Sequence, residues 1–218
     1  MIKSKKSVAI ASLAGRAAAI PAAGQSAWNN PAGGAWSAAT NWTAGVPDSP
    51  GESALIAMLG DYDVTLDRSA TIGSLFVDAP QARVLIPNSK GLGLTGGMFD
   101  NRGGLVVNSS GGGSWTWLRV DQPTTFSGDG EIVLNATAGH LDRAYITHQN
   151  YATFTQQNGH LIRGSGSIYA GFTNEGLILA DRAGETLRLL DQPKTNRGDI
   201  RTENGGVVRI EPVTLTQE

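Results

Sequence analysis

The feature that most constrains the fold of this sequence is a short motif, Asn-x-Gly followed by apolar residues, which recurs along the chain. It occurs at residues 101–105, 174–178 and 196–200, and close relatives occur at 158–162 and 204–208. Asn174 and Asn196 lie 22 residues apart in the sequence. Self-similarity at this period is typical of stacked repeats. At about 3.3 Å per residue, such a repeat holds two or three short strands and their corners.

The segments between these motifs predict β-strands and no long helix. No stretch repeats apolar residues at i, i+3, i+4 and i+7 over three turns, as an amphipathic helix does. Short runs of β-forming residues are instead separated by Gly, Asn, Asp and Ser, which favour turns. The expected strands cover residues 62–66, 72–77, 83–86, 104–107, 115–120, 130–134, 144–147, 160–163, 177–179, 187–190 and 206–210. We therefore predict an all-β fold.

Together, the repeats and the strands predict a parallel β-helix, or β-solenoid, with short strands and Gly/Asn corners. Each coil would pair its backbone with the coils on either side of it and stack Leu, Ile and Val side chains inward. Stability would then be a sum over neighbouring coils, and the ends would need to be covered. The alternative is a β-sandwich with glycine-rich loops, in which the spacing of the Asn-Gly motifs would be accidental.

The repeated Asn and Gly residues are predicted to be structural corners of the coils. An Asn side chain can bond the backbone of the next coil, and Gly adopts a left-handed turn without a steric penalty. The predicted corner residues are Asn101, Gly103, Asn174, Gly176, Asn196, Gly198 and Asn204.

The sequence divides into three predicted parts. Residues 1–24 combine a lysine-containing start, a short apolar run and small residues, which is typical of a secretory signal peptide. The apolar run is too short for the ~20 residues that span a bilayer, so no membrane span is predicted. Residues 25–60 are expected to form an N-terminal cap region, and residues 61–218 the β-solenoid repeats. The protein is therefore predicted to be secreted or displayed on the cell surface.

Three tryptophans near the start of the predicted mature chain indicate how the solenoid closes. Trp28, Trp36 and Trp42 lie within the predicted cap region. Tryptophan buries a large area, and the open end of a solenoid core needs such a cover. We therefore predict a Trp-rich N-terminal cap, with sugar stacking by these residues as the alternative.

Two stretches resemble a known group of proteins. Residues 36–48, with 62–67 and 70–75, are similar to the start of exported bacterial β-solenoids of the autotransporter-passenger and PEP-CTERM-associated kind. Residues 172–180 resemble the repeat unit of those proteins. The resemblance covers most of residues 28–210 and implies a shape rather than a reaction. It implies a surface location and a structural, adhesive or interaction role.

Composition excludes several classes of protein. The chain has no Cys, which excludes disulfides and thiolate metal sites. Its net charge of −2 argues against a nucleic-acid partner, because nucleic-acid-binding proteins are usually basic. The carboxylates and the three His show no metal-ligand spacing, and we predict no metal site and no cofactor.

Trp115 and Trp117 are the candidate ligand-binding residues. They are two apart, so on a strand they would face the same side. No motif joins the scattered Arg and Asp residues, and no catalytic residue is predicted. The favoured function is therefore a non-catalytic structural, adhesive or interaction role. The alternative is a β-helix that binds or cleaves an acidic glycan. Predicted partners are a surface polysaccharide, another surface protein, or a second copy of the chain associating end to end.

Overall fold

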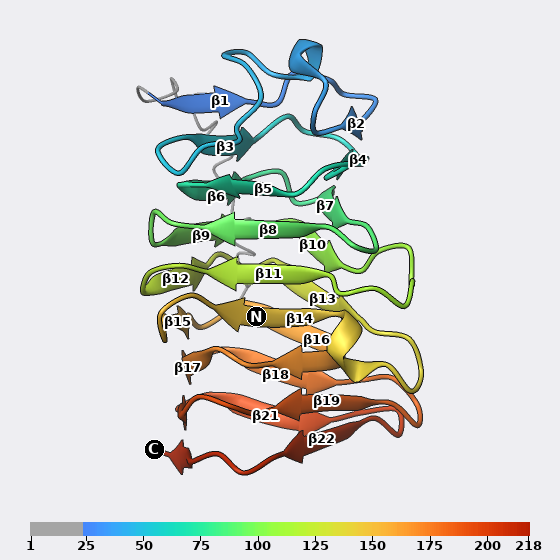
Figure 1. The fold of residues 1–218 in the computed structure, drawn as a ribbon, viewed down its shortest axis with the longest axis vertical. Coiled ribbons are helices and arrows are strands. Elements are labelled where there is room, and N and C mark those ends of the chain that lie inside the picture. The colour runs from blue at the N-terminus through green and yellow to red at the C-terminus, as the bar shows by residue number, and fades with distance from the viewer. Residues whose placement is uncertain (1–23) are drawn as a thin grey trace, which may run out of the picture.

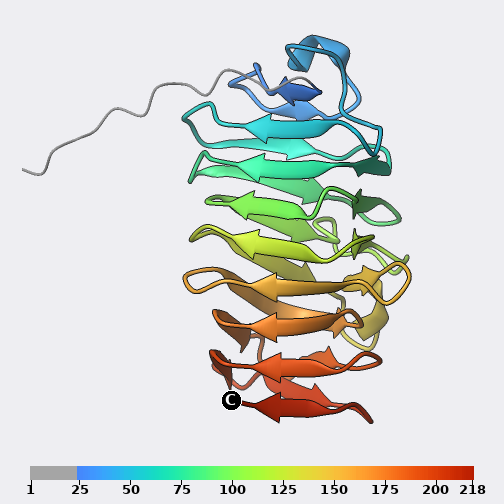
Figure 2. The ribbon, with the colours of Figure 1, turned by 90° about the vertical axis from the view of Figure 1, so that its left-hand side faces the viewer.

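The structure is a computed structural model that describes residues 24–218, so the predicted signal peptide lies almost wholly outside the described residues. The described chain is a β-solenoid whose coils stack along one axis (Figures 1 and 2). Every pairing between its strands is parallel, and the one antiparallel contact is an isolated bridge between Trp28 and Trp42. The prediction of a β-solenoid is confirmed. None of the described helices is long and apolar enough to cross a membrane.

The coils have three faces. The first face is a nine-stranded sheet made of β1 (Gln25–Ala27), β3 (Ser53–Ile56), β6 (Ser74–Val77), β9 (Met98–Asn101), β12 (Thr124–Ser127), β15 (Thr153–Gln156), β17 (Gly171–Asn174), β20 (Lys194–Asn196) and β23 (Leu215–Gln217). The second face consists of β2 (Gly34–Ala35), β4 (Tyr62–Thr65), β7 (Ala82–Ile86), β10 (Gly104–Val107), β13 (Glu131–Asn135), the first part of β16 (Leu161–Ile168), β18 (Leu177–Ala180) and β21 (Asp199–Thr202).

The third face follows the second along each full coil. It consists of β5 (Ala70–Ile72), β8 (Gly91–Leu94), β11 (Trp117–Val120), β14 (Tyr145–His148), the second part of β16, β19 (Thr186–Leu189) and β22 (Val207–Ile210). Because β16 pairs on both faces, it joins them into one folded sheet of 14 strands. The chain bends there at Gly164 and Gly166, both with positive φ, where a Cβ would overlap the backbone of the preceding coil.

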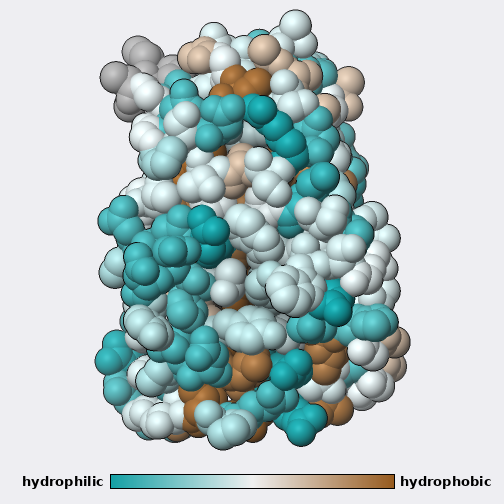
Figure 3. Space-filling view, viewed as in Figure 1, coloured by the Kyte–Doolittle hydropathy of each residue, from teal (hydrophilic) through white to brown (hydrophobic). Residues whose placement is uncertain are grey.

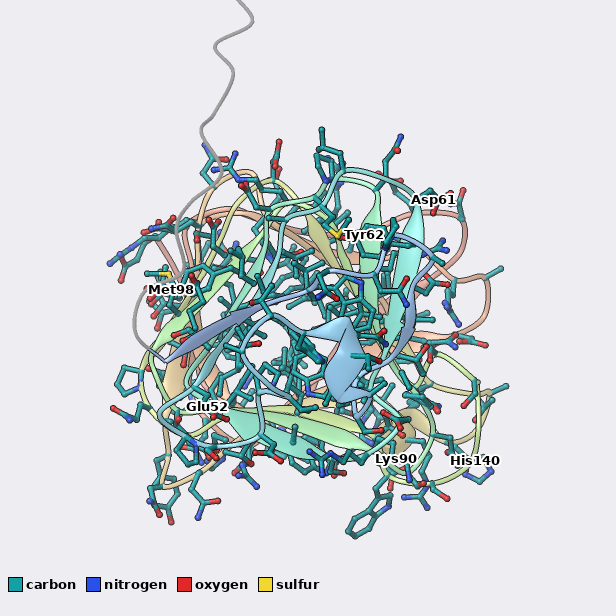
Figure 4. The ribbon with its side chains drawn as sticks, turned by 90° about the horizontal axis from the view of Figure 1, so that it is seen from above. Glu52, Asp61, Tyr62, Lys90, Met98 and His140 are labelled. Atoms are coloured by element: carbon teal, nitrogen blue, oxygen red, sulfur yellow. The ribbon has the colours of Figure 1, made fainter. Side chains whose placement is uncertain are left out.

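Ladders of inward side chains fill the interior, as Figure 4 shows from above. On the third face, Leu118, Ile146, Ile168 and Leu189 stack in register and are fully buried. The first face carries an aromatic ladder instead, whose ring centroids lie 4.5–5.5 Å apart. Its members are Phe99, Phe126, Phe154 and Phe172. These ladders are the hydrophobic core that holds the coils together.

Lys194 occupies the next position of the aromatic ladder and is 1 % exposed. Its Nζ donates to three carbonyl oxygens, those of Gln192 at 2.7 Å, Leu190 at 2.9 Å and Ala170 at 3.3 Å. It also lies 5.4 Å from the Phe172 ring centroid. The ammonium group is thus hydrogen-bonded inside the core, near the end of the described coils.

The tryptophans at the N-terminal end are buried, which confirms the predicted cap. Trp28, Trp36 and Trp42 are 2 %, 0 % and 4 % exposed and contact one another edge to face. Each indole N–H donates to a backbone carbonyl, at 2.7–2.9 Å. A short 3-10 helix, η1 (Ala39–Asn41), precedes Trp42. Because these rings are buried and satisfied, they are not available for sugar stacking.

The strand predictions fail mainly on the first face. The predicted strands at 62–66, 83–86 and 104–107 match second-face strands, but the first-face strands β9, β12, β15, β17, β20 and β23 were not among the predicted ranges. The predicted strand 72–77 is two strands, because Gly73 forms the corner between β5 and β6. The predicted strand 115–120 begins only at Trp117.

Candidate functional site

Two neighbouring coils carry long loops at the corner between the second and third faces. The loops are residues 108–116, between β10 and β11, and residues 136–144, between β13 and β14. Asn108 and Asn135, which open the two loops, lie 27 residues apart, whereas Asn174 and Asn196 of later coils lie 22 apart. In Figure 4 the labels of His140, in the second loop, and Lys90, which precedes β8, mark this corner. The extra residues therefore project beside the third face.

Asn108 and Asn135 anchor the two loops to each other. The Asn108 side chain donates to the Asn135 carbonyl at 3.1 Å, and the Asn135 side chain donates back to the Asn108 carbonyl at 2.8 Å. Asn108 also bonds Gly112 of its own loop through both its amide nitrogen and its oxygen. It is fully buried and has a positive φ of 64°. The loop bases are thus fixed by partly buried hydrogen bonds.

A pocket of about 220 Å³ lies between the loops and the third face. Trp115 comes from the first loop, and Asp142 from η2 (Leu141–Arg143) in the second. Tyr145 and Thr147 lie two positions apart on the outer side of β14, and Tyr169 follows β16. The structure therefore gathers residues from three consecutive coils at one place on the surface.

Aromatic rings dominate this pocket. The Tyr145 and Tyr169 ring centroids lie 5.6 Å apart at an interplanar angle of 78°. Trp115 is 64 % exposed, and the Arg143 guanidinium lies 5.6 Å from its ring centroid. An exposed indole held beside two tyrosines offers flat apolar surface with polar groups at its edge. We call Trp115, Asp142, Tyr145, Thr147 and Tyr169 the aromatic pocket.

Trp117 lies close by but is held differently. Its ring rests on Gly91 of the preceding coil, where a Cβ would come within 2.0 Å of the ring. The Arg119 guanidinium lies over it, 4.8 Å from the ring centroid, and is itself bonded to Asp121 at 2.9 Å. Trp117 is therefore half-buried and does not line the aromatic pocket. The expected pair on one strand is separated, because Trp115 belongs to the loop before β11.

Asp142 is the acidic group of the pocket. Burial alone would raise the pKa of Asp142, but the hydrogen bond from Arg143, with the backbone and the nearby arginines, outweighs it and lowers that pKa. Burial also raises the pKa of Tyr145, with help from Tyr169 and Asp142. The pocket therefore offers a carboxylate at Asp142, which accepts hydrogen bonds, and the protonated phenol of Tyr145, which donates or accepts them.

Most of the predicted corner residues lie at a different corner of the coil from the pocket. This is the corner where the chain passes from the first face to the second. Asn101 accepts from the Gly103 N–H at 3.2 Å and donates to the Glu131 carbonyl of the next coil at 3.0 Å. Asn174 does the same with Gly176, at 3.1 Å, and with the Asp199 carbonyl, at 3.1 Å. Each amide thus closes its own corner and fixes the following coil.

The side-chain amides at the later corners also bond one another from coil to coil. Asn174 donates to Asn196 at 2.6 Å, and Asn196 to the Gly198 carbonyl and to Gln217. A Cβ at Gly103, Gly176 or Gly198 would lie 2.3–2.4 Å from a carbonyl oxygen of the preceding coil. Glycine is needed at these corners because the coils approach so closely. Asn204 lies elsewhere, in an exposed turn between β21 and β22, with a φ of 51°.

Other candidate chemistry is dispersed over the described residues. None of them form a group of three or more His, Asp or Glu that could hold a metal ion. Asp63 pairs with Arg83 at 2.7 Å, so this carboxylate is engaged by a cation. His148 bonds Asp191 at 3.0 Å on the exposed corner between the third and first faces. The largest cavities, of about 700 and 630 Å³, are open grooves at the corner glycines and the last coil.

No protein-family model matches the chain, and neither a curated protein nor a solved structure matches it. The function must therefore be argued from the geometry of the described residues.

Sequence reasoning did not find Asp142, Tyr145, Thr147 or Tyr169. These residues belong to different coils, and only the register of β11, β14 and β16 brings them beside Trp115. One signal was present, since the spacing between related strands widens where the two loops are inserted. Insertions in a repeat protein map to loops on one side, which is often the binding side.

Proposed function

We propose that this β-solenoid is a non-catalytic interaction module of the cell surface or the extracellular space, and that it adheres by binding polysaccharide at the aromatic pocket. The single observation that carries the proposal is the exposed Trp115 ring held beside Tyr145 and Tyr169. Sugar rings present C–H faces that pack on aromatic side chains, while their hydroxyls need hydrogen-bond partners. The pocket supplies both kinds of group within 220 Å³.

Cleavage is not part of the proposal. Hydrolysis of a glycosidic bond uses a pair of carboxyl groups at a defined separation. Among the residues that line the aromatic pocket, Asp142 is the single carboxylate. The exported location and the surface polysaccharide as partner rest on two features of the sequence. These are the signal-peptide pattern of residues 1–24 and the resemblance of the repeats to exported bacterial β-solenoids. They are proposals of the same standing as the binding itself.

The proposal is tested with the purified full chain against a panel of neutral and acidic polysaccharides. Binding is measured by affinity electrophoresis and by titration calorimetry, and new reducing ends are followed in parallel. Trp115→Ala should weaken binding at least 10-fold, because the largest exposed ring of the pocket is lost. Tyr151→Ala, which removes a 74 % exposed ring outside the pocket, is the matched control and should leave binding unchanged.

Three results would overturn the proposal. Failure of every polysaccharide to bind would remove the adhesive role that we assign to the pocket. Equal weakening by Trp115→Ala and Tyr151→Ala would mean that exposed aromatic rings bind without a defined site. Release of reducing ends that disappears with Asp142→Asn would place the protein among the enzymes instead.

A further inference from the structure

Two arginines near the aromatic pocket are each bound by a carboxylate. Arg143 donates to Asp142 at 2.9 Å. Arg188, whose charge also acts on Asp142, donates to both carboxylate oxygens of Glu211, at 2.7 and 2.8 Å. The Arg188–Glu211 pair is bidentate, and such pairs are strong and geometrically fixed. An incoming carboxylate would therefore meet two guanidinium groups that are already paired with carboxylates.

Asp142 is the charged residue of the pocket lining, and it remains accessible. Its side chain is 42 % exposed, although Oδ2 accepts from Arg143. An exposed carboxylate accepts hydrogen bonds from vicinal hydroxyl groups, and such charge-assisted bonds are about twice as strong as neutral ones. The same carboxylate repels another anion at close range. The lining therefore favours hydroxyl-rich, uncharged ligands.

The size of the pocket limits how much of a glycan it can enclose. A volume of 220 Å³ lies below the roughly 300–1,000 Å³ of pockets that enclose drug-sized ligands, so it suits one sugar ring rather than a polymer segment. Trp115 closes one side, and Tyr169 lies on the side of the next coil. A single ring, at the end or on a branch of a chain, fits this shape.

We infer that the aromatic pocket binds one neutral pyranose ring and discriminates against uronic acids through the Asp142 carboxylate. The inference rests on the proposed function and deepens it. The ring packs against Trp115 and the two tyrosines. Two of its hydroxyls donate to Asp142, and others bond Thr147 and the tyrosine hydroxyls. This differs from the acidic glycan that the sequence suggested as an alternative ligand.

The test uses a matched pair of ligands that differ only at C6. The full chain is titrated with methyl glucoside and methyl glucuronide, and with the corresponding galactose pair, by saturation-transfer NMR and calorimetry. We expect at least one neutral glycoside to bind at least 10-fold more tightly than its uronate. Asp142→Asn should weaken the neutral sugar about 10-fold and reduce the preference over the uronate. Asp129→Asn, at an exposed acid outside the pocket, is the control.

The outcomes separate this inference from the proposed function. Tighter binding of the uronates, or an unchanged preference in Asp142→Asn, would overturn the inference while leaving glycan binding intact. Absence of binding by every sugar and polysaccharide would overturn both. The variants should keep the far-UV circular dichroism of the parent, because Asp142 is exposed and lies outside the core ladders.

Discussion

The hydrophobic core is covered to different extents at the two ends of the described solenoid. At the N-terminal end, Trp36 is fully buried and its indole N–H donates to the Pro47 carbonyl at 2.9 Å. In the last coil, Val207 and Ile210 are 47 % and 49 % exposed. Figure 3 shows hydrophobic residues at the bottom of the molecule, where β22 lies. Within the described residues, tryptophans cover the core at the first coils, and the side chains of the last coil are partly exposed.

The difference shows that closing a solenoid requires residues outside the repeat. Ile210 continues the ladder of Ile168 and Leu189 and is half exposed, since β22 pairs only with β19 among the described strands. The tryptophans lie in turns and in an isolated bridge, outside the repeated strands. A repeat sequence thus builds the core, and a separate segment covers it.

The largest expected effect is at the covered end. Trp36→Ala should lower the free energy of unfolding by about 3–5 kcal/mol, because it removes a fully buried ring and leaves a cavity at the top of the core. Urea unfolding followed by far-UV circular dichroism measures this change. Trp115→Ala removes the same side chain from an exposed position and should alter stability by less than about 0.5 kcal/mol. Equal losses for the two would refute the distinction between cap and pocket.

A smaller effect is expected next to the last coil, where Lys194 pairs with Leu215 of the last strand. Burial lowers the pKa of Lys194 from 10.5 to about 8, although Asp191 acts in the opposite direction. Between these pH values the unfolded chain binds more protons than the folded one, so stability should rise as the pH increases from about 8 to about 10.5. At about 1.4 kcal/mol per unit, the rise amounts to at most about 3 kcal/mol.

Urea unfolding at pH 8, 9 and 10 checks this prediction. Lys194→Met should abolish the rise, whereas Lys90→Met, at a partly exposed lysine, should retain it. A flat profile for the parent chain would mean that water reaches the ammonium group through the last coil. Solvent would then reach deeper into the core from the last coil than the burial of Lys194 indicates.

The smallest effect is expected in the last coil itself. Ile210→Ser should change the free energy of unfolding by no more than about 0.5 kcal/mol, because the side chain is already half exposed. Leu189→Ser, one rung earlier and fully buried, is the contrasting variant and should cost several kcal/mol. A loss above 1 kcal/mol for Ile210→Ser, together with a concentration-dependent sedimentation coefficient, would show that a second copy covers this end. That association stays a prediction from the sequence.

The sequence predicts two of the three faces far better than the first. Second-face strands such as β10 contain several apolar residues in a row, which mark them clearly. First-face strands such as β17, with the sequence Gly-Phe-Thr-Asn, carry one apolar ring among polar residues. The signal that could have found them is the residue two positions before the corner amide. Phe99, Phe154, Phe172 and Lys194 all precede an Asn or Gln in this way.

The aromatic pocket could be predicted only in part. Trp115 and Trp117 stand out in the sequence because residues two positions apart face the same side of a strand, but their roles depend on contacts that the sequence does not show. Trp117 is held by Gly91, which lies 26 positions earlier, and Trp115 is completed by tyrosines of later coils. Such contacts depend on the lengths of the inserted loops. Repeat patterns predict the regular coil and not its exceptions.

The mutual hydrogen bonds between Asn108 and Asn135 have a consequence for how the molecule can change. These bonds hold the bases of the two loops together, so the exposed residues in the middle of each loop can vary while the bases stay in place. The corner between the second and third faces can therefore carry different recognition loops. New ligand specificities could be evolved or engineered there while the stacked scaffold stays the same.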